Sequence, residues 1–222
     1  MSDIHGMYDK YIKMLSEINL KESDDLFIIG DSVDIGKNPI KLLKDMSMRS
    51  NVFHILGDCE YNALKNMKTI TDLNGEIKIS DADSFIESLP PHRKTTIKEY
   101  MELDSEGRAA IMEYISEMPL LEAISAGDKE YLLVHAGLKN FSADRALDDY
   151  NIDELIFDAD FVYSTGEFGG VTLVTGHGPS ENHGERRKRA FKSDGHIALD
   201  CGAAQGGVLC AVCLDNGKEY YV

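Results

Sequence analysis

Aspartates and histidines set beside glycines are the residues of this chain that could carry chemistry. They occur in five short segments: Asp3-Ile4-His5-Gly6, Gly30-Asp31-Ser32-Val33-Asp34, Gly57-Asp58-Cys59-Glu60, Val134-His135-Ala136-Gly137 and Gly176-His177-Gly178-Pro179. One such segment alone is more often a turn or a helix cap, but four of the five directly follow apolar, strand-like runs. Carboxylate and imidazole donors together suit Mn, Fe, Zn or Mg. The pattern therefore favours a site for divalent cations.

The elements that must position these segments alternate between strand and helix. Residues 26–29 and 52–56 are apolar runs that end in Gly-Asp, and helical patterns follow each of them. Another helical pattern covers residues 7–20. Strands that alternate with helices form α/β sheets whose ligands bind at the carboxyl ends of the strands. The sequence therefore predicts an α/β fold with its site at those ends.

The rest of the chain divides into a helical and a β-rich part. Residues 62–122 are helical in pattern and rich in charge, so we expect a helical cap inserted into a single domain over residues 1–222. The β-like runs lie at residues 131–134, 171–174, 196–199, 208–214 and 219–222. Only Met1 and Ser2 precede Asp3, which is fewer residues than a central strand normally supplies. Either the true start lies upstream or the chain manages without that strand.

The composition is that of a folded and strongly acidic domain. The chain has 222 residues, 43% of them hydrophobic, and a formal net charge of −16. A surface of this sign repels duplex nucleic acid and anionic membranes, and no stretch approaches the ~20 apolar residues of a membrane span. No secretory signal is visible, so we expect a cytoplasmic protein. Any turnover of phosphates would need local positive charge, which bound metal ions supply.

Other histidines and the cysteines have structural interpretations. His54 lies inside an apolar strand, and His92 follows two prolines and is expected to be exposed. Cys210 and Cys213 form a C-x-x-C pair in an apolar run that predicts a buried strand. Residues three apart on a strand point to opposite faces, which is unfavourable for a shared zinc ion or a disulfide.

The five segments resemble the motifs of the calcineurin-like metallophosphoesterases. Within that family they are most similar to serine/threonine protein phosphatases and bacterial symmetrical diadenosine tetraphosphatases. The family run is Asp-x-His-Gly, Gly-Asp-x-Val-Asp-Arg-Gly, Gly-Asn-His-Glu, His-Ala-Gly and Gly-His-Thr-Pro. The tail at residues 198–209 is similar to the family's final hairpin. The resemblance covers nearly the whole chain apart from the helical middle, and it implies a four-layer α/β/β/α sandwich.

The resemblance also implies a role for each ligand. Six residues would hold two metal ions. The first ion would be held by Asp3 and His5, and the second by Asp58, His135 and His177. Asp31 would bind both ions. A water between the ions, ionised near neutral pH, attacks phosphorus in line without a covalent intermediate. The expected cofactors are two divalent metal ions, Mn in the first place, with Fe, Zn and Mg as alternatives.

The chain departs from the family pattern at residues 35, 58 and 59 and in the stretch 155–160. Asp58 replaces an Asn and remains a competent ligand. Cys59 replaces the His that protonates the leaving oxygen, which Asp34 would normally orient. A thiol, with a pKa near ~8.5, is a weaker donor, and losing a general acid typically costs ~10²–10⁴-fold. Ile35 replaces an Arg that grips the substrate phosphate, and residues 155–160, where a second such Arg is expected, contain none.

Candidate substrate-binding replacements follow the His177 segment, where basic residues cluster: Arg186, Arg187, Lys188 and Arg189. A solvated basic turn that balances an acidic chain explains the same cluster.

The favoured function is hydrolysis of a phosphomonoester by a dinuclear-metal phosphoesterase, with Asp31, Asp34 and Cys59 as catalytic residues. The substrate would be a phosphoprotein, a small phosphate ester or a nucleotide. The lost Arg and His leave two alternatives open. One is a phosphodiesterase or nucleotide polyphosphate hydrolase, and the other is a degenerate domain that binds metal or phosphate with little turnover. Retention of all six ligand positions favours a hydrolase.

Overall fold

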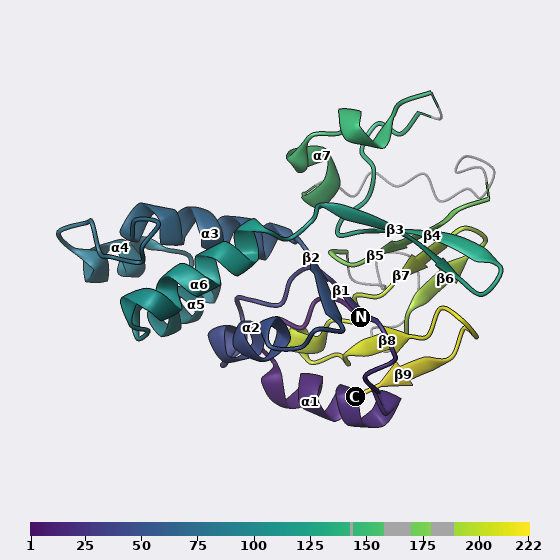
Figure 1. Cartoon of the computed structure of the whole chain (residues 1–222), viewed down its shortest axis with the longest axis horizontal. Coiled ribbons are helices and arrows are strands. Elements are labelled where there is room, and N and C mark those ends of the chain that lie inside the picture. Colours follow the sequence, from purple (N-terminus) through teal and green to yellow (C-terminus); the bar gives the residue numbers. More distant parts are fainter. Residues whose placement is uncertain (143, 158–169, 179–188) are drawn as a thin grey trace.

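The computed structural model describes residues 1–142, 144–157, 170–178 and 189–222, and it is an α/β protein (Figure 1). Its elements are α1 (Tyr8–Ile18), β1 (Leu26–Ile29), α2 (Pro39–Ser47), β2 (Val52–Ile55), α3 (Asp58–Ile70), α4 (Ala82–Ser88), α5 (Pro91–Met101), α6 (Ser105–Ser116), β3 (Leu121–Ala126), β4 (Lys129–Val134), α7 (Ile152–Ile156), β5 (Thr172–Thr175), β6 (Phe191–Ser193), β7 (His196–Ala198), β8 (Cys210–Val212) and β9 (Glu219–Tyr221). The predicted α/β class is confirmed.

The described strands form two layers that pack face to face. β1 and β2 are parallel, β8 and β9 are antiparallel, and a five-stranded sheet has the order β3-β4-β5-β7-β6. Apolar side chains from these groups share one core cluster between the layers, which includes Ile29, Ile55, Cys210, Leu133 and Val174. Burying this apolar surface contributes about 25 cal/mol per Å².

Helices cover the outer faces of both layers. Tyr11 of α1 and Leu42 of α2 belong to the core cluster that contains Ile28 of β1. On the second sheet, the alternation of a strand sends Leu133 into the inter-sheet core and Leu132 into the opposite cluster, which contains Leu155 of α7. The layer order therefore agrees with the expected α/β/β/α sandwich.

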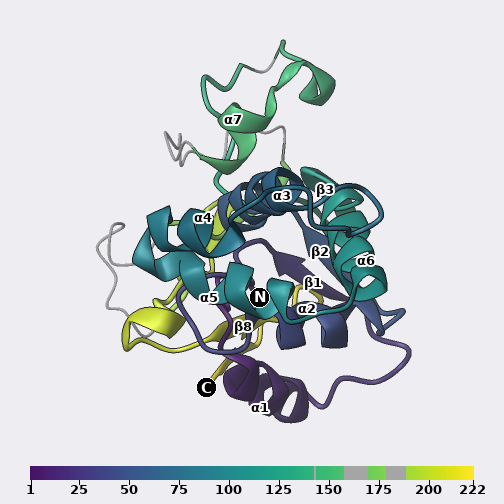
Figure 2. The ribbon, with the colours of Figure 1, turned by 90° about the vertical axis from the view of Figure 1, so that its left-hand side faces the viewer.

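Helices α3 to α6 occupy most of residues 62–122, where the sequence predicts a helical cap, and the assignment of this stretch as an insertion stays a prediction. α3, α4, α5 and α6 lie together on one side of the sheets (Figures 1 and 2). α3 begins four residues earlier than expected, at Asp58, and β3 already begins at Leu121. The hydroxyls of Thr71 and Tyr100, 2.6 Å apart, join the end of α3 to α5. The first turn of α3 thus belongs to the strand-end edge, and the rest of the helix belongs to the insertion.

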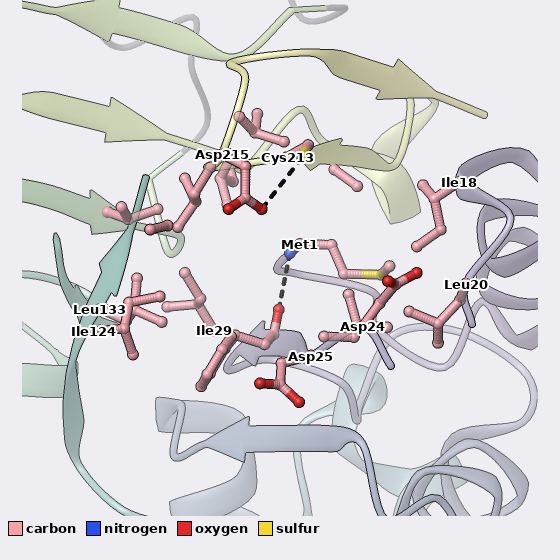
Figure 3. Close-up of a pocket in the computed structure, with 18 of the residues that line it drawn as sticks. Met1, Ile18, Leu20, Asp24, Asp25, Ile29, Ile124, Leu133, Cys213 and Asp215 are labelled. Carbon is pink, nitrogen blue, oxygen red and sulfur yellow. Dashed lines mark hydrogen bonds between the residues drawn. The ribbon is translucent and has the colours of Figure 1, made fainter. Parts of the chain in front are cut away.

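The first three residues occupy a strand position beside β1. The Met1 ammonium donates to the carbonyl of Phe27 at 2.9 Å, the Ile29 N–H donates to the carbonyl of Met1 at 2.9 Å, and the Asp3 N–H donates to the carbonyl of Gly30 at 3.1 Å. A cavity of about 510 Å³ opens beside this ammonium between the two sheets (Figure 3). Burial lowers the pKa of the ammonium to about 6.

The two cysteines of the C-x-x-C pair lie in different environments. Cys210 is buried in β8, whereas Cys213 lies past the end of that strand and is partly exposed, and none of the four cysteines is in a disulfide. Within the described ranges, no helix is both long enough and apolar enough to cross a membrane.

Met67, which is fully buried in α3, tests how the insertion packs against the domain. We expect Met67→Ala to lower the free energy of unfolding by about 2–5 kcal/mol, because it leaves a cavity in the core. The matched control is Met48→Ala, since Met48 is 85% exposed and its truncation should change stability by less than about 0.5 kcal/mol. Equilibrium urea denaturation followed by circular dichroism measures both, and equal effects would contradict the described packing of α3.

Candidate metal centre

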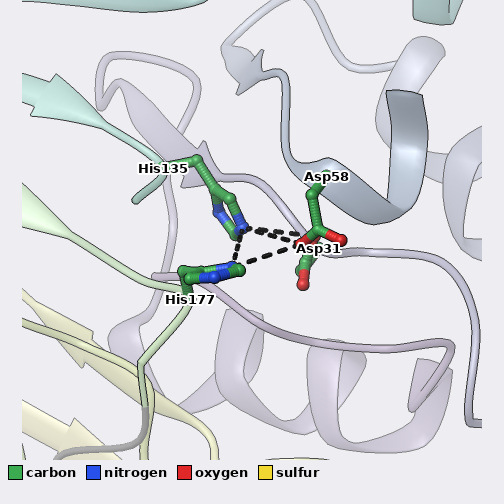
Figure 4. A group of neighbouring side chains, drawn as sticks. All are labelled: Asp31, Asp58, His135 and His177. Carbon is green, nitrogen blue, oxygen red and sulfur yellow. Dashed lines mark hydrogen bonds and ion pairs between the residues drawn. The ribbon is translucent and has the colours of Figure 1, made fainter. Parts of the chain in front are cut away.

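The candidate centre lies where parallel strands of both sheets end. Parallel strands β1 and β2 are followed by Asp31 and Asp58, and parallel strands β4 and β5 are followed by His135 and His177. The carboxyl ends of parallel strands share one edge of a sheet, so each pair of residues is brought together. Figure 4 shows the four side chains converging from the two sheets.

The donor atoms of these four side chains are spaced like the ligands of one ion. Nε2 of His135 lies 3.3 Å from Oδ1 of Asp31 and 3.5 Å from Oδ1 of Asp58. Nδ1 of His177 lies 3.2 Å from Oδ1 of Asp58 and 3.2 Å from Nε2 of His135. Ligands about 2.1 Å from a metal ion stand roughly 3.0–3.5 Å apart in octahedral or tetrahedral geometry. This observed spacing fits a divalent cation.

Asp31 also belongs to a second donor group. Its Oδ2 lies 3.8 Å from Nε2 of His5, whereas its Oδ1 is the oxygen that faces His135. His5, Asp31 and Cys59 each offer a ligand atom, and these atoms lie within 4.8 Å of one another. The two oxygens of Asp31 therefore face two groups of donors, which is the arrangement of a bridging carboxylate.

Backbone carbonyls orient two of the imidazoles for ligation. Nδ1 of His135 lies 2.9 Å from the carbonyl oxygen of Ile29, and Nδ1 of His5 lies 3.0 Å from that of Val33. With the proton placed on Nδ1, each ring donates to a carbonyl and keeps a lone pair on Nε2, which points at Asp31.

Glycines permit the close approach of these segments. A Cβ atom on Gly30 would lie 2.4 Å from Nδ1 of His135, and one on Gly176 would lie 2.3 Å from Oδ2 of Asp3. Gly30 also has a φ of +73°, which L side chains rarely adopt. A larger residue at either position would push the donors apart.

Glu60 joins the two aspartate segments, a role that the sequence alone did not reveal. Its fully buried carboxylate accepts four backbone N–H groups, at distances of 2.6–3.1 Å, from Asp31, Ser32, Val33 and Gly57. One sign of this role was available, because Glu60 is the third residue of α3, where a glutamate caps the helix start. The carboxylate thus fixes the end of β1 against the start of α3.

Asp3 is buried near the centre, but its contacts differ from those of His5. Its two oxygens accept the backbone N–H of His177 at 3.1 and 3.2 Å. Burial, followed by the nearby Asp200 carboxylate, raises the pKa of Asp3. Among the described residues Asp3 is in neither donor group, so its role as a metal ligand stays a prediction.

The charges of the centre favour a cation. Burial alone would lower the pKa of His135, yet the Asp31 and Asp58 carboxylates raise it well above its usual range. Burial opposes ionisation of Asp58, but hydrogen bonds with His135 and His177 hold the pKa of its carboxyl below its usual range. A buried, anionic group of oxygen and nitrogen donors fits divalent metal ions.

The residues that depart from the family pattern lie around this centre. Cys59 is in the first turn of α3, where burial, followed by the Asp31 carboxylate, raises the pKa of its thiol. Asp34 does not face an imidazole partner of the expected kind, and its Oδ1 instead accepts a hydrogen bond from Oγ1 of Thr96 at 2.7 Å. Ile35 is partly exposed and has a φ of +57°, which is strained for a β-branched residue.

Of the four basic residues predicted to bind substrate, the structure describes Arg189. Arg189 is exposed. Arg186, Arg187 and Lys188 lie outside the described residues, so the role of this cluster stays a prediction. The core position predicted for His54 is confirmed, because it is buried and its ring lies 3.0 Å from the Ser32 hydroxyl.

An α/β sandwich whose strand ends gather aspartates and histidines defines a protein of the metal-dependent phosphoesterase class. The model of the calcineurin-like phosphoesterase family matches residues 1–203, and the chain belongs to that family. The symmetrical bis(5'-nucleosyl)-tetraphosphatase of Wigglesworthia glossinidia brevipalpis is 24% identical over 140 residues, which are 62% of this chain and 43% of that relative. The chain thus matches less than half of that relative's length.

Solved structures share the fold at low sequence identity. A protein provisionally named a diadenosine tetraphosphatase is 20% identical, with a TM-score of 0.68 over 100% of this chain and 90% of that one. A metallophosphoesterase from Sphaerobacter thermophilus is 15% identical, with a TM-score of 0.52 over 90% of this chain and 74% of that one. The cold-active protein-tyrosine phosphatase of a psychrophilic Shewanella is 14% identical, with a TM-score of 0.51 over 100% of this chain and 78% of that one.

Glu60→Gln tests the connection between the two aspartate segments. An amide keeps only one acceptor oxygen and loses the charge, so some of the four backbone N–H groups lose their partner. Each lost charge-assisted bond costs about 1.5–3 kcal/mol, so we expect a large loss of stability and weaker Mn²⁺ binding. Urea denaturation and calorimetric metal titration measure the two effects.

Glu87→Gln is the control, since the exposed Glu87 bonds only surface lysines, at 2.7 Å from Lys94 and 3.0 Å from Lys98. Unchanged metal affinity in Glu60→Gln would show that the two segments hold their places without this carboxylate.

Proposed function

We propose that this protein hydrolyses a nucleotide polyphosphate of the bis-nucleoside kind, with two divalent cations held by the candidate centre. Mn²⁺ is the first candidate, with Fe, Zn and Mg as alternatives. The observation that supports the proposal is that Cys59 lies beside Asp31 and His5. By the family resemblance, residue 59 takes the place of a proton-donating histidine. The tetraphosphatase name of the curated relative supports the same substrate class.

The ligand residues have defined tasks in this proposal. Asp31 presents one oxygen to each donor group, His5 on one side and His135 with Asp58 on the other. The cations, when bound, supply the positive charge that activates a water and screens the charge developing on the phosphoryl group. Glu60 holds the backbone of both aspartate segments, so these carboxylates need not reorganise during the reaction.

The chemistry of the leaving group selects the substrate. An alkoxide such as that of serine must be protonated as it leaves, and a thiol in place of an imidazole is a poor donor at neutral pH. A phosphate or nucleotide leaving group is stable as an anion and needs no proton. Loss of the histidine therefore costs a polyphosphate hydrolase less than it costs a phosphoserine phosphatase.

Phosphomonoesters, favoured by the sequence alone, become the second candidate. Aryl esters remain chemically compatible with Cys59, because a phenol leaves more readily than an alcohol. Four cysteines without a disulfide agree with a reducing compartment, so a cytoplasmic location is part of the proposal.

The deciding experiment compares kcat/KM for diadenosine tetraphosphate, para-nitrophenyl phosphate, bis-para-nitrophenyl phosphate and a phosphoserine peptide, each with Mn²⁺. We expect the polyphosphate to be hydrolysed fastest and the phosphoserine peptide slowest. A higher kcat/KM for the phosphoserine peptide than for the polyphosphate would contradict the proposal. No turnover of any of the four would favour a domain that binds metal or phosphate without catalysis.

Asp31→Asn tests the shared carboxylate. The amide removes a negative charge and one of the two oxygens that face the donor groups, so we expect metal-dependent turnover to fall by at least about 10³-fold. Initial rates with diadenosine tetraphosphate, together with the metal content by atomic absorption, measure the effect. Asp45→Asn, in α2 away from the strand ends, is the control and should retain activity. Turnover near the wild-type rate in Asp31→Asn would remove Asp31 from the centre.

Cys59→His restores the family residue. Since an imidazole protonates a departing alkoxide, we expect kcat for the phosphoserine peptide to rise by about 10-fold or more, and kcat for diadenosine tetraphosphate to change little. The ratio of the two kcat values is the measurement. An equal change for both substrates would show that residue 59 does not occupy the position of the acid.

A further inference from the structure

The start of helix α5 lies against the loop that carries Asp31. The backbone N–H of Ile35 donates to the carbonyl of His92 at 2.8 Å, and the N–H of Asp34 donates to Oγ1 of Thr96 at 2.9 Å. Farther along the helix, Oε2 of Glu99 accepts the N–H of Ile40 at 3.1 Å. The inserted helix and the metal-site loop are thus joined at several points, and the first turn of the helix has a fixed position.

Asp34 and Arg93 face each other within this contact, and both have an unused polar atom. Asp34 is 1% exposed, and its Oδ1 is bonded to Thr96, but its Oδ2 is buried and has no hydrogen-bond partner among the described residues. Nε of Arg93 lies 3.7 Å from that oxygen and is likewise buried without a hydrogen bond. This ion pair holds the near side of the guanidinium while the side chain stays 27% exposed.

The same helix start lies beside the loop of the metal centre. His92, which precedes Arg93, accepts the N–H of Ile35 through its backbone carbonyl, and Ile35 belongs to the loop that carries Asp31. Asp34, which faces Arg93, stands three residues after Asp31 in the same loop. Arg93 therefore lies beside the loop of Asp31, which belongs to both donor groups, and we call this side of the centre its rim.

Within the described part of this rim, the position that carries an arginine in the family carries no charge. The loop residue Ile35, where the family has an arginine, is apolar and 41% exposed. An arginine is well suited to the missing task, because its planar guanidinium binds two phosphate oxygens at once and stays charged at any relevant pH. A carboxylate at its Nε leaves its terminal nitrogens available for such a pair of bonds.

We propose that Arg93, held by Asp34 at the start of the inserted helix α5, binds the non-bridging oxygens of the substrate phosphate in place of the arginine that Ile35 replaces. This inference rests on the proposed function, since it assigns a substrate-binding residue to the same site. In this arrangement Asp34, without an imidazole at residue 59 to orient, positions the arginine instead. The insertion then contributes directly to substrate binding.

The test uses the full chain loaded with Mn²⁺ and inorganic phosphate as the probe. We expect Arg93→Ala to raise the dissociation constant of phosphate, measured by calorimetry, and the KM of the best substrate by about 10- to 100-fold each. Arg93→Lys, which keeps the charge but loses the planar fork, should fall between Arg93→Ala and the native protein. Bound Mn²⁺ should be unchanged in both variants.

Lys94→Ala is the matched control, because Lys94 is the next cation on the same helix and is bonded to Glu87 at 2.7 Å. Its phosphate affinity should stay within about 2-fold of the native value. Ile35→Arg, added to Arg93→Ala, should recover most of the lost affinity by restoring an arginine at the family position. This rescue would not occur if Arg93→Ala had merely disturbed the fold.

The outcomes separate this inference from the proposed function. If Arg93→Ala binds phosphate as tightly as the native protein, or if Lys94→Ala loses as much affinity, the inference is overturned even where polyphosphates are hydrolysed. If no polyphosphate is hydrolysed but phosphate affinity still depends on Arg93, the inference stands and the substrate assignment fails.

Discussion

The carboxylate of Glu60 is the interaction on which the centre depends. It accepts N–H groups from the end of β1 and from Gly57 at the start of α3, and so fixes the two aspartate-bearing segments against each other. Three residues of the first segment, Asp31, Asp34 and Ile35, have positive φ angles of 54–64°. Such conformations cost of order 1–3 kcal/mol each and persist only where the surroundings over-determine them. Glu60 at one end of the loop and α5 at the other provide that constraint.

Much of the fold was predictable because it depends on local patterns. β1 was predicted with the observed limits, and β2, β4, β5, β7, β8 and β9 overlap the predicted runs, since each is a short apolar stretch with a core on at least one face. β3 and β6 were missed. Among the described strands β3 pairs only with β4 and is largely exposed, and β6 has three residues and pairs only with β7. Neither carries a strong apolar pattern. Pairing with a neighbour, rather than sequence, makes them strands.

The same distinction applies to the centre. Parallel strand ends bring Asp31, Asp58, His135 and His177 together, and their positions after apolar runs made this convergence predictable. The contacts of Thr96 and Arg93 with Asp34 span about sixty residues and depend on how the insertion docks, so no local pattern could indicate them. The roles of Asp3 and of the basic cluster near Arg189 remain predictions, because Asp3 stands outside the donor groups and most of the cluster lies outside the described residues.

The departures at residues 35 and 59 change different parts of a phosphoesterase without removing its centre. Metal ligation depends on the strand ends, whereas proton donation and phosphate binding depend on side chains that project from the loops between strand and helix. A chain can therefore lose the histidine and the arginine and keep its ligands. Docking of α5 against the Asp34 loop then becomes part of the site, because it returns a guanidinium to the rim from which one was lost. On this view, the helical segment is more than a solvated cap. It adapts the metal centre to a substrate whose leaving group needs little protonation.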